Sequence, residues 1–594
     1  MKNSLRLSII TQSIASTLLF AGITSNAHSQ TQAISEEQRR RAAEDAAQQD
    51  QLRRSQTDAL QRQQQLQAPN VDLQNAASAK ALNTLTLPTE SPCFTIHQFV
   101  LAVPPQLSSS AQLAGASALP FDPFRFAQDY LQQYDGACVG QVGLNLIVER
   151  LTNLILQKGY STTRISIPEQ DLSTGVMHLT LVPGVIHAIR FADQSLYGAA
   201  RNAFPTGAGQ LLNLRDLEQG LEQMKRVSNQ DVNMEIVPTD VPGESDVVLD
   251  VKRSKPWTLA ANFDNSGAKG TGQLQAGLSL GINNLLGLSD ILNLGISSDA
   301  DRHGGDRGTG GRNVYYAVPM GYWNYSLSAS DYTYHQKIAG ANEDYVSSGK
   351  SQSLEFKVSQ LFQRDQFQKN SWQLKLGKRW SDAFIDDTEI GVQKRNTTYV
   401  ELGWVHTHYF GNAQLDFTLA NRWGSPLLGA QSNADDRPSD YPTFMYTIQT
   451  VDATLSVPFK IADQPLTYIA TFRGQNTRSP LYLTDQFTIG GRYTVRGFDG
   501  ELTLAGERGF YLRNEFDLPI ANTGQSAYVG VDFGKVYGPS VQYLLGDTLA
   551  GATVGVRGGF KGFTYDVFSG WALYKPAQFK TATPSVGFNL TYQY

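Results

Sequence analysis

The sequence is poor in cysteine and histidine, with only Cys93 and Cys138 and eight histidines among 594 residues. A tetrahedral metal site needs about four clustered thiolate or imidazole ligands, so neither a metal nor another cofactor is expected. In an exported protein, a lone pair of cysteines usually forms one disulfide. We therefore expect Cys93 and Cys138 to be bonded.

Strong net charge and long hydrophobic runs are also missing. The formal net charge is −5, which gives no indication of a nucleic-acid partner. Beyond Ala27, no window offers about 18 consecutive apolar residues. This excludes a bundle of membrane-spanning helices and leaves either a soluble protein or a closed β-barrel.

The amino end carries an export signal. Lys2 and Arg6 precede a mostly apolar run, which a small-x-small pattern ending at Ala27 follows. Residues 1–27 are therefore predicted to be a secretory signal peptide. A transmembrane anchor is the alternative, but polar residues interrupt a run that is already short for a bilayer.

A polar segment comes next. Residues 32–67 are rich in Gln, Ala, Arg and Glu, and Ser35 with Gln38 forms a capping box, which predicts a helix without an apolar face. Such a helix crosses water, lies in a polar cavity or is a frayed linker. We assign residues 28–67 to this helix and residues 68–91, which have no sustained period, to a periplasmic linker.

The next part of the chain has the pattern of two small α/β modules. Residues 92–184 predict a strand, two helices and a strand pair, with Gly159 at a helix C-cap. Residues 185–254 repeat this order in a shorter form, with one strand, one helix over residues 214–227 and a strand pair. Two tandem β-α-α-β-β modules are the simplest account.

Residues 255–594 alternate with period two. In residues 273–283, Leu274, Leu278 and Ile282 point to one face, and polar or small residues point to the other. Segments of this kind, rich in Tyr and Phe and separated by Gly, Asn and Asp, indicate an outer-membrane barrel. The 338 residues from Trp257 to the end (594 − 257 + 1) allow about sixteen strands at roughly 20 residues each. A soluble β-sandwich or propeller is the alternative.

This order of segments resembles the transporters of two-partner (type Vb) secretion systems, the TpsB-type family that exports haemolysins, filamentous adhesins and contact-dependent growth inhibition toxins. The resemblance covers nearly the whole mature chain. Its most specific motifs are GYSTTRISIPEQDLSTGVMHLTLVPG at 159–184, GLSLGINNLLGLSD at 277–290, GGRYTVRGF at 490–498, ERGFYLRNEF at 507–516 and VGVDFGKV at 529–536.

The resemblance implies a mainly β fold: an N-terminal plug helix, two periplasmic polypeptide-transport-associated (POTRA) modules and a 16-stranded transmembrane β-barrel in the outer membrane of a Gram-negative bacterium. It also implies a monomeric pore, inserted among outer-membrane lipids by the barrel assembly machinery. The pore would carry one large partner exoprotein to the cell surface without nucleotide hydrolysis. That partner would arrive unfolded and dock on the POTRA modules through its N-terminal secretion domain.

The same resemblance implies the candidate site residues. An inward loop carries a VRGF motif, a wall strand anchors it through a G-x-D-x-G motif, and the first module has its own motif. These residues are Val495, Arg496, Gly497 and Phe498; Gly530, Asp532 and Gly534; and Gln170, Asp171, Leu172 and Gly175. Arg496 is expected to pair with Asp532 through a charge-assisted contact. The alternatives are that Arg492 or another acid takes part in the pair, or that Arg496 is solvated.

Enzyme motifs are missing from the sequence. GVDFGKV lacks the spacing of a phosphate loop, and neither a G-x-S-x-G elbow nor an H-E-x-x-H helix occurs. Two rival functions stay open at this point, an outer-membrane protein insertase of the same superfamily and a passive porin. The plug-like helix and the room for only two modules disfavour the insertase, and a porin has no need of POTRA modules.

Overall fold

A computed structural model gives the structure of the protein. It describes Gln38, Ala42, Glu44 and residues 46–51, 53–57, 69–73, 86–115, 122–196, 198, 200–301, 305–339, 343–521 and 523–594. The predicted signal peptide and most of the predicted linker lie outside these residues. In the part of the chain that the structure describes, no helix has the length and hydropathy to span a bilayer.

The first module is built from two small sheets and three helices. Strands β2, β5 and β4 form one sheet in that order, and β1 pairs with β3. The elements are β1 (Phe94–Ile96), β2 (Gln98–Ala102), α3 (Ser109–Ala114), α4 (Arg125–Gln132), β3 (Ala137–Val139), α5 (Gln141–Gln157), β4 (Arg164–Ser166), the 3-10 helix η2 (Leu172–Thr174) and β5 (Val176–Val182). α5 buries Ile147, Leu151 and Ile155 at four-residue spacing, which turns one helix face to the core.

A disulfide joins Cys93 and Cys138, whose Cα atoms lie 5.4 Å apart, as the sequence predicted. Cys93 directly precedes β1, and Cys138 lies in β3 opposite Thr95. The bond therefore links the start of β1 to β3 within the small β1–β3 sheet.

The second module consists of β6 (Val185–Phe191), α6 (Leu214–Lys225), β7 (Gln230–Pro238) and β8 (Glu244–Arg253), with strand order β6-β8-β7. Its core contains Leu217, Leu221 and Val247, all nearly inaccessible to solvent. Among the described residues of 185–253, α6 is the single α-helix, and the module has the predicted shorter order of one strand, one helix and a strand pair. The chain from 192 to 213 is mostly turns and bends.

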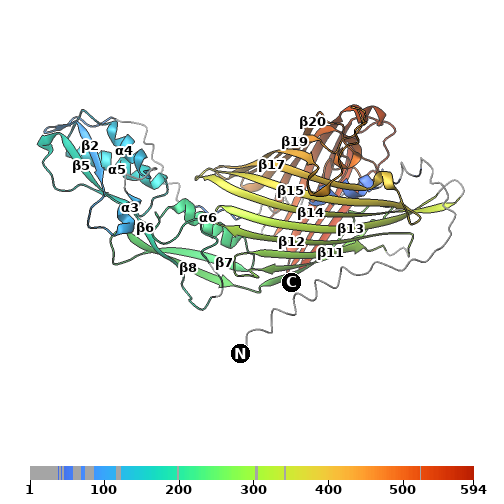
Figure 1. Ribbon diagram of the computed structural model, residues 1–594, viewed down its shortest axis with the longest axis horizontal. Helices are drawn as coiled ribbons and strands as arrows, with labels where there is room; N and C mark the ends of the chain where they lie inside the picture. The colour runs from blue at the N-terminus through green and yellow to red at the C-terminus, as the bar shows by residue number, and fades with distance from the viewer. Residues whose placement is uncertain are drawn as a thin grey trace. The chain divides into compact units, whose positions relative to one another are not determined.

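A closed antiparallel barrel follows (Figure 1). Its described residues form sixteen wall strands, which confirms the predicted number. The strands are β9 (Trp257–Asp264), β10 (Gln275–Asn283), β11 (Ile291–Asp299), β12 (Arg307–Met320), β13 (Trp323–Ala339), β14 (Asp344–Arg364), β15 (Gln368–Ile385), β17 (Arg395–Phe410), β18 (Ala413–Ser425), β19 (Thr447–Ile461), β20 (Gln464–Thr477), β23 (Arg508–Ile520), β24 (Gln525–Tyr537), β25 (Thr548–Phe560), β26 (Phe563–Tyr574) and β27 (Ser585–Gln593). β27 pairs with β9 and closes the ring. The two-residue β16 (Thr388–Glu389) only folds back on β15.

The wall strands alternate as the sequence predicted. On β14, the outward Leu354 and Phe356 are exposed, and the intervening Glu355 turns inward, where it accepts a hydrogen bond from the hydroxyl of Tyr399 on β17. Lipid tails can cover the outward residues, and the inward ones meet a polar lumen. The domain boundaries after residues 91, 184 and 254 stay predictions.

Candidate functional site: the barrel lumen

A long loop between β20 and β23 carries the sequence GGRYTVRGF. Two short strands, β21 (Phe487–Ile489) and β22 (Leu504–Gly506), pair as a hairpin at its base. Residues 490–503 lie between them and form few regular elements. The loop therefore depends on contacts with the barrel wall for its position.

Apolar packing supplies one set of these contacts. Val495 is fully buried and Phe498 nearly so. They belong to a cluster of loop and wall residues that includes Ile489, Val536 and Leu549. The ring of Phe498 also meets that of Phe579 edge to face, with centroids 5.7 Å apart. This cluster packs the loop against the inner faces of β24 and β25.

The second set is ionic and centres on Arg496 and Asp532. The Arg496 Nε donates to Asp532 Oδ2 at 2.8 Å and Nη2 donates to Oδ1 at 2.9 Å. The backbone N–H of Arg496 also donates to Oδ2, at 2.9 Å. Both side chains are almost completely buried, with 5% and 1% of their surface exposed. A buried charge pair of this kind needs such complete hydrogen bonding to be stable.

Glu515 on β23 is a second acid that contacts the same guanidinium, through Nη1. Arg557 on β25 contacts Glu515 in turn and donates to Asp517 Oδ2 at 2.9 Å. Glu515 faces Gly530 across the β23–β24 ladder, so both acids reach Arg496 from neighbouring strands. Arg496, on the loop, is thus the inner end of a series of alternating charges, and the other members of the series lie on β23, β24 and β25.

Arg492, the alternative considered from the sequence, has different partners. Its Nη1 donates to Asn265 Oδ1 and its Nη2 to the backbone oxygen of Phe588, both at 3.3 Å. These residues lie beside β9 and in β27, near the strand pair that closes the barrel. Arg492 and Arg496, the two arginines of the GGRYTVRGF motif, therefore contact different parts of the wall.

Glycines give the loop room against the wall. A Cβ at Gly530 would lie 2.4 Å from Arg496 Nη2, and one at Gly534 would lie 2.8 Å from Val495. Gly497 has φ +102°, which a residue with a Cβ rarely adopts. A Cβ at Gly551 would lie 1.8 Å from the Arg496 backbone oxygen, and one at Gly570 would lie 2.8 Å from the Cα of Gly497. The backbones of loop and wall are therefore in direct contact.

The polar N-terminal segment is helical at residues 46–51 and 53–57 and meets the loop. The Gln48 amide donates to the backbone oxygens of Gly500 and Glu501 at 3.1 and 3.0 Å. Gln51 donates to the backbone oxygen of Leu483 at 2.9 Å. The helix and the loop are thus joined mainly through side-chain amides and backbone carbonyls.

The same helix contacts the inner face of the wall. Arg53 donates to the hydroxyl of Ser330 at 3.0 Å, and the hydroxyl of Tyr332 donates to Gln49 at 3.3 Å, both from β13. Arg54 lies 3.8 Å from Asp485, just before β21. These contacts are polar, as expected for a helix without an apolar face in a hydrated lumen.

The motif of the first module has a local structural role. Gln170 exchanges two hydrogen bonds of 2.7 Å with the backbone of His178 on β5, which extends the sheet beyond β4. Asp171 caps η2 through Ser173 N, and the hydrogen bonds from Ser173 lower the pKa of its exposed carboxyl. Gly175 ends η2 in the left-handed conformation, and Leu172 packs on the module's core.

The structure therefore brings together the VRGF and G-x-D-x-G residues, and it places the first-module motif in a separate α/β core. Sequence reasoning did not name Glu515, Arg557 or Phe579. Glu515 lies inside the quoted motif ERGFYLRNEF, on the same strand face as Arg513, so the period of two could have indicated it. The roles of all these residues in transport stay predictions.

Comparison with known proteins gives consistent matches along the chain. Residues 243–558 match the family described as haemolysin secretion/activation protein ShlB/FhaC/HecB, residues 185–238 a POTRA domain, and residues 108–184 a POTRA domain of the ShlB type. The chain is 49% identical over 512 residues to the outer membrane transporter CdiB-2 of Burkholderia pseudomallei strain 1026b, which covers 86% of this chain and 88% of that protein.

Two solved structures are also similar. CdiB from Acinetobacter baumannii has a TM-score of 0.79 at 28% identity, covering 92% of this chain and 99% of that one. CdiB from Escherichia coli has a TM-score of 0.78 at 26% identity, covering 95% of this chain and 100% of that one.

Proposed function

This chain belongs to the ShlB/FhaC/HecB family of haemolysin secretion/activation proteins, and from that premise we propose that it exports one large partner protein across the outer membrane. The partner reaches the periplasm unfolded and binds the POTRA modules through an N-terminal secretion domain. It then passes through the barrel to the cell surface. The protein itself is a monomeric transporter and not an enzyme.

The observation that best supports this proposal is the content of the lumen. Sixteen strands enclose a space wide enough for water, and here a helix and a loop occupy it. The helix is bound by hydrogen bonds between polar groups such as Gln48 and Gly500. Each such bond contributes only about 1 kcal/mol net, because water offers nearly equivalent partners. An occupant held in this way can leave and return.

Exposed strand edges of the modules suit an unfolded partner. An extended chain can add to a sheet edge through backbone hydrogen bonds, whatever its side chains are. Passage through the barrel needs no nucleotide if the partner folds outside, because a folded chain does not return through the pore. Folding at the surface would thus supply the direction of transport.

A deletion of the gene tests the proposal. Culture medium, periplasm and outer membrane are compared by quantitative mass spectrometry before and after complementation. We expect one very large protein to vanish from the medium or the cell surface. A general fall in outer-membrane β-barrel proteins would instead support an insertase. A change in small-solute uptake alone would support a porin.

A further inference from the structure

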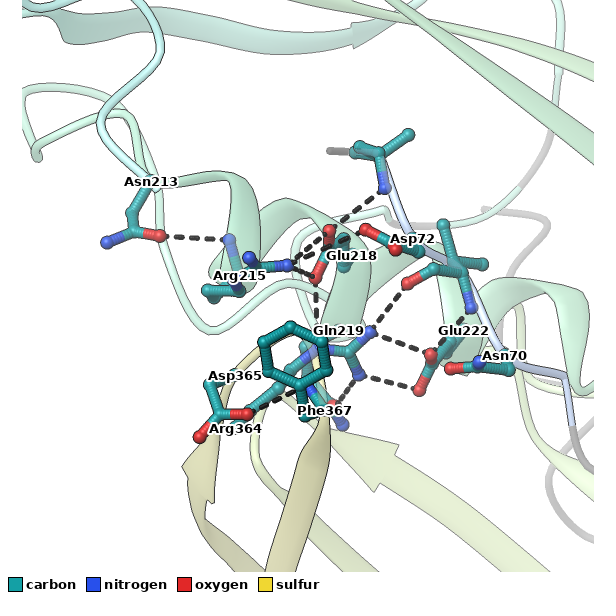
Figure 2. A network of polar contacts seen from close by, with 12 residues as sticks. Asn70, Asp72, Asn213, Arg215, Glu218, Gln219, Glu222, Arg364, Asp365 and Phe367 are labelled. Carbon is teal, nitrogen blue, oxygen red and sulfur yellow. Dashed lines mark hydrogen bonds and ion pairs between the residues drawn. The ribbon is translucent and has the colours of Figure 1, made fainter. Parts of the chain in front are cut away.

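Residues 69–73 of the predicted linker are bound to the protein and do not form a free tether. They lie against α6 of the second module and the turn between β14 and β15 (Figure 2). The backbone N–H of Val71 donates to Glu222 Oε1 at 2.8 Å, and that of Leu73 donates to Glu218 Oε1 at 2.9 Å. Arg364 Nη2 donates to the backbone oxygen of Val71 at 2.8 Å.

The spacing of the two carboxylates matches an extended chain. Alternate residues of a strand lie about 6.6 Å apart, and residues four apart on a helix are separated by about 6.0 Å along its axis. Glu218 and Glu222 are four apart on α6, and they accept from two N–H groups that are two residues apart. Two carboxylates one helical turn apart thus accept hydrogen bonds from alternate N–H groups of an extended peptide.

An ionic frame holds the two carboxylates in place. Arg364 donates to both oxygens of Glu222 at 2.7 Å and lies 3.3 Å from Glu218. Arg215 donates to Glu218 at 2.9 Å, and Lys369 lies 2.8 Å from Glu222. The side chains of Arg364 and Glu218 are 3% and 1% exposed. Burial would raise the pKa of Glu222, but the hydrogen bonds and charges of Arg364 and Lys369 lower it.

Most of the recognition involves backbone atoms. The side chain of Val71 packs against the core of the second module, and Asn70 Oδ1 accepts from Lys369 at 3.1 Å. The side chains of Asp72 and Leu73 stay well exposed. Asp72 Oδ1 lies 3.8 Å from Arg215 Nη1, so the site suits an extended peptide with one apolar residue followed by an acidic one.

We propose that α6 and the β14–β15 turn form a binding site for an extended peptide, which residues 69–73 occupy as a tethered, displaceable ligand. The incoming occupant is an extended segment of the exported partner, and its identity rests on the function proposed above. Displacement frees the linker, and the helix that precedes it in the chain loses one of its attachments. Partner binding and opening of the lumen are coupled in this way.

A peptide in trans tests the site directly. The probe is labelled, end-blocked Pro-Asn-Val-Asp-Leu, the sequence of residues 69–73. The receptor is the full chain with residues 69–73 replaced by Gly-Ser repeats of equal length, so that the site is vacant. We expect binding by fluorescence anisotropy. Binding to the unaltered chain should be much weaker, because the resident segment competes.

Methylation of the peptide nitrogens of Val71 and Leu73 removes both donors and keeps every side chain. Each charge-assisted hydrogen bond accounts for roughly a tenfold change in affinity, so the methylated probe should bind about a hundredfold more weakly. Equal binding of the two probes would overturn the proposal. So would the absence of binding by either probe, provided that heat-modifiability on gels shows the vacant receptor to be folded.

Two receptor variants distinguish a loss of the peptide-binding site from a general disturbance of the contact between α6 and the barrel. Glu222→Gln in the vacant receptor should weaken binding about tenfold. Tyr322→Phe is the matched control, because Tyr322 donates to Asp216 on the same helix without contacting residues 69–73. An equal loss of peptide affinity in both variants would show a general effect on the contact between α6 and the barrel and would contradict the proposed site.

Bilayer recordings test the coupling to the lumen. Added to the unaltered chain, the unmethylated peptide should increase the open fraction severalfold, and the methylated peptide should not. An identical response to both peptides would overturn the coupling. The secretion assay is independent of these measurements: unchanged secretion after gene deletion would refute the proposed function and leave the peptide result intact.

Discussion

Arg496 and Asp532 are joined both by a side chain and by a backbone: the guanidinium and the N–H of the same arginine converge on one carboxylate, with three contacts of 2.8–2.9 Å. A side-chain contact alone would fix a guanidinium at the end of a flexible stem. The added backbone bond also fixes the course of the loop at that residue. The pair is therefore a positional constraint on the loop inside the barrel.

Arg496→Ala should strongly reduce secretion while the barrel still inserts. Loss of Arg496 leaves the buried Asp532 with Arg513, at 4.0 Å, as its only cation among the described residues, and breaking a buried charge pair costs about 3–5 kcal/mol. The strand ladder and the lipid-facing band do not involve Arg496, so heat-modifiability on gels should persist. Secreted partner is measured in the medium. Arg508→Ala, the loss of an exposed guanidinium near the same loop, is the control and should secrete normally.

Asp532→Ala should give a similar defect, and the double variant should be little worse than either single one. The second change removes a partner that the first has already lost. Exchange of the charges, Arg496→Asp with Asp532→Arg, should rescue only partly, because the backbone bond and Glu515 favour the original arrangement. Fully additive single defects would mean that the two residues do not act as a pair.

Gly530→Ala tests the same contact by steric means. The new Cβ would meet Arg496 Nη2 at 2.4 Å and the Asn514 backbone oxygen at 2.8 Å, so the guanidinium must move. We expect a secretion defect that approaches that of Arg496→Ala. Gly310→Ala on β12 is the matched control, because its nearest neighbour is the Thr333 hydroxyl at 3.3 Å. Comparable losses in both variants would point to a general intolerance of wall substitutions.

Deletion of residues 32–67 should raise the single-channel conductance in planar bilayers while secretion continues. The helical residues contact the loop and β13 mainly through polar groups, as in the hydrogen bonds of Gln51 and Arg53 and the 3.8 Å approach of Arg54 to Asp485. Their removal leaves water in the space that they fill. An unchanged conductance would contradict the role of this helix as a plug.

The Cys93–Cys138 bond should stabilise the first module. It closes a loop with a sequence separation of 45, for which the chain-entropy model gives roughly 3–4 kcal/mol. Purified protein should show no free thiol before reduction. Reduction should make the module, but not the barrel, sensitive to limited proteolysis, as followed by mass spectrometry of the fragments. Equal protease resistance with and without reductant would mean that the disulfide contributes little to the stability of the first module.

Much of this fold follows from local patterns. The period of two in segments such as 273–283 predicted wall strands, because only that period separates a lipid face from a lumen face. The polar helix also followed from composition, and the inward loop followed from the resemblance of its VRGF motif to that of a known family. The single helix of the second module also followed from the pattern of residues 214–227, whereas the turn-rich stretch 192–213 before it carries no decisive period.

Contacts between residues far apart in the chain could not be predicted from local patterns. Glu515 reaches Arg496 because the β23–β24 register sets it opposite Gly530, and register depends on pairing along the whole strand. The binding of residues 69–73 to α6 was also missed. Its recognition depends largely on backbone N–H and C=O groups, which nearly all residues carry and which leave little trace in a sequence pattern.

The close approach of loop and wall has a consequence for how this barrel can change over time. Gly551 and Gly570 touch the backbone of the loop, so no larger side chain fits at either position without moving the main chain. A clash between side chains can be relieved by a second substitution nearby, but a clash with a carbonyl cannot. The loop and the strands behind it are therefore free to diverge only as one unit.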